Sequence, residues 1–292
     1  MTLKITLRTF GMSHEPGQLK EILEKTRSLQ KGETVLFPEY GAYTVAGSRQ
    51  AFAELSRTAV EKGITIITTL NLPSPELPAT RAPSHYNTLH VFSRGGEIYT
   101  PQAKITPQSF EMRHLDPKSP EINVAPYSQL NKVTLRQNGR DYRGFFLICS
   151  DLYVLQYFDK TQLESDVLLC PANFGNGAEI AAAGLIDAAI KTRIFKQGFL
   201  CNTYQEVAAG LTPLTKRMEI SFTAGKEILP YRQDEMRRKV KTASAIYPDE
   251  QYRNFLSMLP LTKKGTFTVP LSRSSEKGLN VKLGVFEKVV EL

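Results

Sequence analysis

The sequence predicts a layered α/β fold in a single main domain, and three observations lead to this expectation. Amphipathic helical segments alternate with apolar, β-branched runs, as in α/β proteins. Two further segments read as hairpins around glycine-containing turns. No linker-like composition and no internal repeat divides the first 210 residues. We therefore expect a sheet that is covered by helices on one face.

The elements are expected in the following order. Lys4–Thr9 alternates as a strand, and Pro16–Leu29 has apolar residues at helical spacing. Residues 33–41, "ETVLFPEYG", form an apolar strand that stops at Pro38. Residues 48–63 form a helix with a serine cap and a glycine stop, and the β-branched run 64–70 is a buried strand.

The second half continues the alternation. A proline-rich loop (73–83) precedes a hairpin over 86–105 that turns at Arg94, Gly95 and Gly96, and a loop follows over 106–130. A strand pair flanks 137–144, another buried strand lies within 164–175, and an alanine-rich helix is expected over 177–197. The remaining strands are 199–205, Thr266–Leu271 and Val281–Val290. We expect the main domain over 1–270, with 271–292 as a carboxy-terminal extension of the same domain.

Composition excludes several classes of protein. No apolar run approaches the roughly 20 residues of a membrane span, and the amino-terminal alternation does not resemble a signal peptide. We therefore expect a cytoplasmic protein without a membrane partner. Three cysteines in 292 residues do not suggest a disulfide framework. The four histidines (His14, His85, His90 and His114) lack metal-ligand spacing, so no metal is expected.

The net charge of +8 motivates a nucleic-acid-binding alternative. Fifteen Lys and Arg residues against nine acidic residues lie in 216–292, which places six of the eight net charges in the last quarter. The densest basic cluster, "MRRKVK" at 236–241, carries no interleaved aromatic residues. A solvated helix face explains this cluster better, so we expect no specific nucleic-acid partner.

Candidate functional residues stand where the predicted strands end. Glu39 follows "VLFP", Lys104 closes the first hairpin, Cys149 ends "FFLIC", and Asn173 follows "LLCPA". Residues at the exits of strands along one edge of a sheet converge on a crevice. A thiol that meets an acid and an amine there is a candidate nucleophile. The alternatives are a turn acid for Glu39, a surface lysine for Lys104 and a loop cap for Asn173.

Four segments carry a resemblance to a known family. "LFPEYG", "YNTLHVFSRGGEIYTPQAKITP", "GFFLICSD" and "SDVLLCPANFG" resemble the successive signatures of the nitrilase superfamily, the carbon–nitrogen hydrolases. This resemblance implies an α-β-β-α sandwich and a catalytic triad of Glu39, Lys104 and Cys149. It covers roughly residues 1–210. It also implies that the enzyme needs no cofactor and forms a homodimer or a higher homo-oligomer.

The resemblance further implies supporting roles. Glu111 is the second glutamate that many members place after the lysine, although a salt-bridging or helix-start acid is the alternative. Ser150 is expected to supply a backbone oxyanion donor, and Asn173 a wall of the substrate pocket. Cys170 and Cys201 lie inside apolar strands, so core packing is expected for both.

The chain departs from the family pattern at two places. "CSDLYVLQYF" replaces the family's usual sequence after the cysteine, and Lys196 stands at a position that is commonly glutamate. Two functions are therefore weighed. The first is hydrolysis of a small amide, as an amidase or an N-carbamoyl hydrolase, through a thioester. The second is a catalytically inactive binding or regulatory protein with the same fold.

Overall fold

The structure is a computed structural model of the whole chain, and part of the chain is described by it. The described residues are 3–8, 10, 17–72, 87–107, 111, 124, 127–174, 193–203, 220–223 and 281–292, with Ala182, Leu185, Ile186, Ala189 and Ile190 between them. The expected strand Thr266–Leu271 and the basic cluster at 236–241 lie outside these residues, as do His14, His85 and His114.

The first half of the chain forms a five-stranded sheet in the order β1-β2-β3-β4-β5. Its strands are β1 (Thr6–Leu7), β2 (Thr34–Leu36), β3 (Thr65–Asn71), β4 (Asn87–Phe92) and β5 (Ile98–Ala103). Strands β1, β2 and β3 are parallel, whereas β4 and β5 are antiparallel to their neighbours. Helices α1 (Gly17–Thr26) and α2 (Val45–Lys62) make the two crossovers between the parallel strands.

The second half forms a six-stranded sheet in the order β10-β9-β8-β7-β6-β11. Its strands are β6 (Gln129–Gln137), β7 (Arg140–Phe146), β8 (Ser165–Ala172), β9 (Phe195–Asn202), β10 (Ile220–Thr223) and β11 (Lys282–Glu291). The 3₁₀ helix η2 (Cys149–Tyr157) and the short helix α3 (Lys160–Leu163) connect β7 to β8. The expected strand at Val281–Val290 is therefore confirmed as β11, which pairs in parallel with β6.

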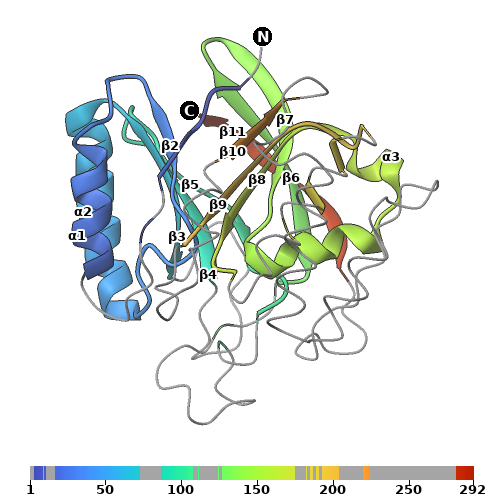
Figure 1. Cartoon of the computed structure of the whole chain (residues 1–292), viewed down its shortest axis with the longest axis horizontal. Helices are drawn as coiled ribbons and strands as arrows, with labels where there is room; N and C mark the ends of the chain where they lie inside the picture. The colour runs from blue at the N-terminus through green and yellow to red at the C-terminus, as the bar shows by residue number, and fades with distance from the viewer. Residues whose placement is uncertain are drawn as a thin grey trace, which may run out of the picture.

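The two sheets pack face to face and form the centre of a four-layer arrangement (Figure 1). One apolar cluster joins the sheets and includes Leu36 and Ile67 from the first and Phe146 and Leu169 from the second. A second cluster packs α1 and α2 on the outer face of the first sheet. The third cluster packs five described helical residues on the outer face of the second sheet: Ala182, Leu185, Ile186, Ala189 and Ile190. The expected α-β-β-α sandwich is thus confirmed.

Burial on both faces explains the continuous apolar runs of the central strands. Consecutive side chains of a strand point to opposite faces of the sheet. Leu168 and Cys170 face the outer layer, whereas Val167 and Leu169 face the other sheet. A strand in this position needs apolar residues at every site, because neither face meets water. Each sheet therefore forms an inner layer. The ends of β2 and β8 meet at one edge, where the backbone N–H of Glu39 donates to the carbonyl of Ala172.

Helix α2 begins earlier than the sequence suggests. The expected cap was a serine, but Thr44 is the N-cap, and its hydroxyl accepts a hydrogen bond from the backbone of Gly47 at 3.0 Å. Ser48 lies inside the helix, is buried, and accepts a hydrogen bond from the backbone of Asn71. The expected glycine stop is confirmed, because Gly63 has a φ of 63° at the end of the helix.

The boundary between 177–197 and 199–205 also differs from the expectation. Strand β9 begins at Phe195 and therefore includes the end of the expected alanine-rich helix. Arg193, with a φ of 60°, turns the chain just before this strand. Phe195 packs in the core against Phe145, so burial of an aromatic residue outweighs the helical pattern at this point.

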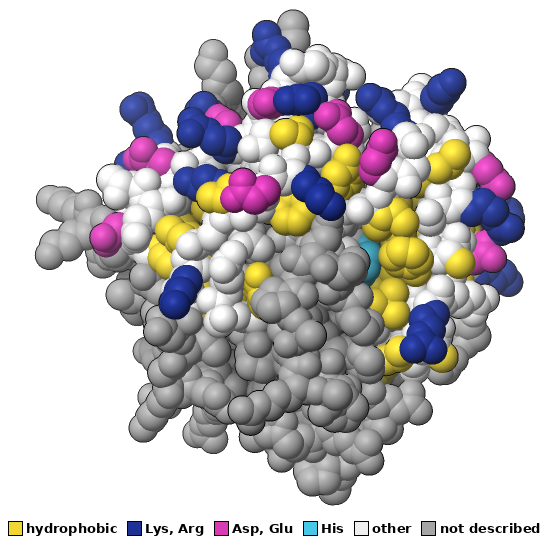
Figure 2. Space-filling view, turned by 180° about the vertical axis from the view of Figure 1, so that it is seen from behind, with side chains coloured by type: hydrophobic (Ala, Val, Ile, Leu, Met, Phe, Trp, Pro, Cys, Tyr) yellow, Lys and Arg dark blue, Asp and Glu magenta, His cyan; other side chains and the backbone are white. Residues whose placement is uncertain are grey.

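The described surface mixes charges of both signs. On the face seen in Figure 2, Lys and Arg side chains alternate with Asp and Glu over the described elements. Among the described residues, Lys196 pairs with Asp166 and Arg136 pairs with Asp141. Within the described ranges, no helix combines the length and the hydropathy that a membrane span requires.

Candidate active site

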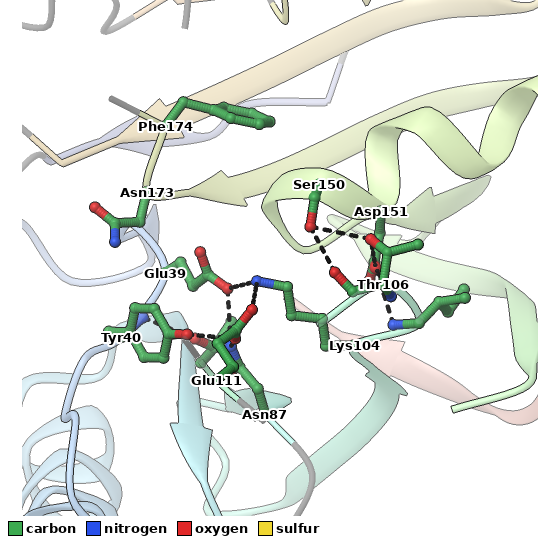
Figure 3. Close-up of polar contacts among 12 residues, drawn as sticks. Glu39, Tyr40, Asn87, Lys104, Thr106, Glu111, Ser150, Asp151, Asn173 and Phe174 are labelled. Carbon is green, nitrogen blue, oxygen red and sulfur yellow. Dashed lines mark hydrogen bonds and ion pairs between the residues drawn. The ribbon is translucent and has the colours of Figure 1, made fainter. Parts of the chain in front are cut away.

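Glu39 and Lys104 meet in a fully buried ion pair at the edge of the first sheet (Figure 3). Glu39 follows β2, and its backbone N–H donates to the carbonyl of Ala172 at the end of β8. Lys104 follows β5, and its backbone N–H donates to the carbonyl of Asn87 at 2.8 Å. The ammonium of Lys104 lies 2.5 Å from Oε1 of Glu39. Strand ends from both sheets thus create the site.

Glu111 completes a cluster of two carboxylates around the ammonium. Its Oε2 lies 2.9 Å from Nζ of Lys104, and the residue is fully buried. The Asn87 amide donates to Oε1 of Glu39 at 2.8 Å and reaches Glu111 at 3.5 Å. The hydroxyl of Tyr40 donates to Oε1 of Glu111 (Figure 3). Glu111 therefore lies in the same buried cluster as Glu39 and Lys104, and its ion pair with Lys104 is the salt bridge named as an alternative in the sequence analysis.

Cys149 lies at a sharp turn rather than at the end of a strand. Strand β7 ends at Phe146, and Cys149 opens η2 with a φ of 53°. This left-handed conformation is costly for a residue with a side chain and is found often at functional sites. The side chain is 5% exposed and faces the carboxylate of Glu39 closely enough to affect its pKa. The turn thus places the thiol beside the acid.

The two titrating partners are tuned by burial. Desolvation raises the pKa of Glu39 to about 7, against the opposing charge of Lys104 and with a further rise from Glu111. Burial and the charge of Glu39 also raise the pKa of the Cys149 thiol well above its usual range, although Lys104 and the backbone N–H of Asn173 oppose this rise. Cys149 is therefore held as a thiol, beside a carboxyl group whose raised pKa favours proton exchange near neutral pH.

Lys104 keeps its charge. Burial by itself would lower the pKa of this ammonium, but the charges of Glu111 and Glu39 outweigh burial and raise the pKa well above its usual value. The ammonium has three N–H donors, and two of them are directed at the carboxylates. Lys104 can therefore offer its remaining N–H to an oxygen that becomes negative beside Cys149.

Asp151 joins the turn of Cys149 to the strand end of Lys104. Its Oδ1 accepts the backbone N–H of Ile105 at 2.9 Å, and the backbone N–H and hydroxyl of Thr106 at 2.7 and 2.9 Å (Figure 3). The hydroxyl of Ser150 donates to the carbonyl of Thr106 at 2.7 Å. The Ser150 hydroxyl is thus used in a structural hydrogen bond. The backbone N–H of Ser150 lies in the first turn of η2, where N–H groups lack acceptors within the helix.

Asn173 lies beside the thiol but directs its side chain elsewhere. Its backbone N–H faces Cys149, and its side-chain oxygen accepts a hydrogen bond from the Thr203 hydroxyl at 2.6 Å. Asn173 therefore combines a loop-holding side chain with a backbone donor toward the sulfur. Tyr40, Asn87, Thr106 and Asp151 were not predicted to support the site, although all four lie within the motif segments quoted above.

The other cysteines and His90 belong to the core. Cys170 and Cys201 are fully buried among apolar side chains, as expected from their positions in the strands. His90 stacks on Phe92 and meets Phe52 edge to face, and its Nδ1 contacts the carbonyl of Thr88 at 2.9 Å. Within the described part of the chain, no group of three His, Cys, Asp or Glu side chains is placed to hold a metal ion.

Comparison with solved structures finds similar folds. A mutant of the amidase from Nesterenkonia sp. AN1, in complex with butyramide, matches with a TM-score of 0.50 and 16% identity over 68% of this chain and 76% of that chain. The NitN amidase of the same organism matches with a TM-score of 0.51 and 16% identity, over 80% and 98% of the two chains. XC1258 from Xanthomonas campestris, a CN-hydrolase superfamily protein, matches with a TM-score of 0.52 and 13% identity, over 84% and 96%.

Comparisons at the level of sequence are negative. No protein-family profile matches the chain, and no curated protein matches it. The likeness therefore resides in the arrangement of the sheets and layers, which agrees with the fold that the sequence motifs imply. The chain has the fold of the nitrilase-superfamily amidases and CN-hydrolases.

Proposed function

We propose that the protein is a cysteine-dependent hydrolase of the nitrilase superfamily that cleaves a non-peptide C–N bond, most directly that of a small amide. The single observation that carries this proposal is the buried convergence of Glu39, Lys104 and Glu111 beside the strained turn of Cys149. A structural core has no need for two carboxylates, an ammonium and a thiol in one desolvated cluster.

The acylation half of the reaction begins with proton transfer from the Cys149 thiol to the carboxylate of Glu39. The sulfur attacks the amide carbon, and the carbonyl oxygen becomes an oxyanion that Lys104 and the backbone N–H of Ser150 stabilise. Glu39 returns the proton to the amide nitrogen as the C–N bond breaks. Ammonia or an amine leaves, and the acyl group remains on the sulfur as a thioester.

The deacylation half uses the same groups in the reverse order. Glu39 takes a proton from water, and the resulting hydroxide equivalent attacks the thioester carbon. The oxyanion forms again at Lys104 and Ser150. The C–S bond then breaks, the acid product leaves, and the proton on Glu39 restores the thiol. A pKa near 7 suits Glu39 to both directions of transfer at neutral pH.

One observation that suggested a catalytically inactive relative, the lysine at position 196, does not concern the candidate site. Lys196, the departure from the family pattern, is 73% exposed and pairs with Asp166 at 2.6 Å. It is therefore an element of the surface and not of the Glu39 cluster. The homo-oligomeric assembly, the cytoplasmic location, and a domain over 1–270 with 271–292 as an extension of the same domain stay predictions.

A screen for ammonia release tests the proposal. The wild-type chain and the Cys149→Ala variant are compared on short aliphatic amides, beginning with butyramide, and on N-carbamoyl amino acids and nitriles. We expect ammonia from at least one amide or carbamoyl compound, and none above background with Cys149→Ala. Absence of wild-type release throughout the panel, together with a Cys149 that iodoacetamide modifies no faster than free cysteine, would favour the inactive relative.

A further inference from the structure

We propose that Tyr40 is a positioning residue of this site: its hydroxyl holds Glu111 and thereby keeps Lys104 against Glu39. This inference rests on the proposed function, because it assigns a role within the same cluster. Tyr40 is fully buried, and its only polar side-chain atom donates to Oε1 of Glu111 (Figure 3). The other oxygen of Glu111 pairs with Lys104 at 2.9 Å. Glu111 is therefore held from both sides.

The backbone of Tyr40 is shaped for this contact. In an extended chain, consecutive side chains point to opposite faces, so Glu39 and Tyr40 would not meet one ammonium. Tyr40 instead has a φ of 62°, a left-handed conformation that is disfavoured for a bulky residue. Its backbone N–H donates to the Thr69 hydroxyl at 2.8 Å, which helps to hold the turn. The strained turn brings the neighbouring residues Glu39 and Tyr40 into the same cluster.

The ring of Tyr40 adds to the same arrangement. Its centroid lies 5.9 Å from Nζ of Lys104, and the ring of Tyr43 packs against it at 5.3 Å. An ammonium near an aromatic ring gains electrostatic stabilisation, most strongly in a desolvated site. Tyr40 therefore contacts both members of the Glu111–Lys104 pair, and its phenol is kept protonated because burial and the charges of Glu111 and Glu39 raise its pKa well above the usual value.

The Tyr40 hydroxyl affects how closely the Lys104 ammonium approaches each of the two carboxylates, Glu39 and Glu111. Asn87 makes its shorter hydrogen bond to Glu39, at 2.8 Å, and reaches Glu111 only at 3.5 Å. Without the Tyr40 hydroxyl, Glu111 would depend more heavily on Lys104. The ammonium would then move toward Glu111 and away from Glu39. Since Lys104 opposes the rise in the pKa of Glu39, that pKa would increase further.

The pH dependence of Cys149 alkylation by iodoacetamide measures this effect without a known substrate. In the wild type, the rate should rise with pH around 7, as Glu39 becomes able to accept the thiol proton. We expect Tyr40→Phe to shift this rise upward by about half a pH unit or more, since one pKa unit corresponds to only 1.36 kcal/mol. On an amide that the wild type hydrolyses, turnover should fall roughly tenfold, the effect of one lost hydrogen bond to a charged group, with KM changed much less.

Two further variants make the test specific. Tyr43→Phe removes a hydroxyl from the neighbouring ring and should leave the alkylation profile at its wild-type position. Glu111→Gln removes the negative charge that raises the pKa of Glu39, so it should shift the profile downward, opposite to Tyr40→Phe. In the Glu111→Gln background, Tyr40→Phe should add little, because the proposed action passes through Glu111.

The outcomes separate this inference from the proposed function. A wild-type profile without a rise near neutral pH contradicts the role of Glu39 and hence the proposed function. A normal wild-type profile that Tyr40→Phe leaves unmoved overturns the positioning role alone, as does an equal shift by Tyr40→Phe in the Glu111→Gln background. Should Tyr40→Phe not fold, as judged by circular dichroism, an unmoved profile in Glu111→Gln would still overturn the inference.

Discussion

Oδ1 of Asp151 lies 2.7 Å from the backbone nitrogen of Thr106, and this contact joins the two halves of the candidate site. Asp151 belongs to the turn that carries Cys149, whereas Thr106 lies two residues beyond Lys104. The same oxygen also accepts the backbone N–H of Ile105. A displacement of either segment would therefore move the thiol relative to the ammonium. Asp151 fixes their separation although it does not belong to the triad.

Asp151→Ala should destabilise the fold and slow the reaction together. It leaves two buried backbone N–H groups without acceptors, and each such group costs about 1–3 kcal/mol. Asp151→Asn retains an oxygen acceptor and should lose much less stability. Denaturant unfolding and Cys149 alkylation on the same preparations check this order. Equal stability of the Ala and Asn variants would contradict the role of the carboxylate oxygen.

The carboxyl of Asp151 also predicts a dependence of stability on pH. Burial raises its pKa to about 6, against the opposing effects of Lys104 and Thr106. Its folded pKa exceeds the unfolded value near 3.9, so the folded state binds the proton more tightly between these values. This group therefore favours unfolding as pH rises from about 4 to 6. Unfolding free energies are measured at pH 4, 5 and 6 for the wild type and for Asp151→Asn, which cannot titrate at this position. The stability of Asp151→Asn relative to the wild type should increase from pH 4 to pH 6.

The three cysteines should separate chemistry from packing. Cys149→Ala should reduce turnover below about a thousandth of the wild-type value, because no thioester can form. Cys170→Ala and Cys201→Ala remove fully buried side chains and should each lower the free energy of unfolding by roughly 1–3 kcal/mol, with activity per folded molecule preserved. Steady-state turnover beside denaturant unfolding distinguishes the two patterns. Loss of activity in a folded Cys170→Ala protein would contradict this division.

Lys104→Arg tests whether the ammonium contacts the oxyanion. Lys104 is enclosed by Glu39, Glu111 and the Tyr40 ring, and the planar fork of arginine cannot occupy the same point. The loss of one oxyanion donor typically costs about 10²–10³ in turnover. We expect at least a hundredfold loss of turnover, with a much smaller effect on the alkylation of Cys149.

A matched control accompanies this variant. Lys196→Arg makes the same substitution at an exposed ion pair with Asp166 and should leave both rates unchanged. Near-wild-type turnover in Lys104→Arg would contradict direct contact between Lys104 and the oxyanion, and Lys104 would then act only as a source of positive charge.

The sequence predicts the order of elements well where periodicity and turn chemistry agree. The hairpin over 86–105 and the strand at 64–70 appear as β4–β5 and β3, because glycine turns and β-branched runs admit few alternatives. The start of α2 could not be predicted as well, since both Thr44 and Ser48 are good caps and only tertiary burial of Ser48 decides between them. The same competition between local pattern and burial moved Phe195 into β9.

The candidate site was predictable in its motif residues and not in their supports. Glu39 and Lys104 follow strand ends, Cys149 lies three residues beyond the end of β7, and strand ends on one edge converge for topological reasons. The contribution of Tyr40 depends on a positive φ at a residue other than glycine, which sequence pattern does not reveal. Asn87 and Asp151 act through contacts between segments 48 and 45 residues apart, so only the folded chain displays them.

The most direct test of the central claim is to trap the acyl group on the nucleophile. Wild-type protein is mixed with an amide that yields ammonia in the screen, quenched in acid during turnover, digested and mapped by mass spectrometry. We predict that the acyl mass resides on the peptide of Cys149, is removed by hydroxylamine as a thioester, and is absent from Cys170 and Cys201. Continued ammonia release with no acyl group on Cys149, or undiminished release by Cys149→Ala, would contradict the account.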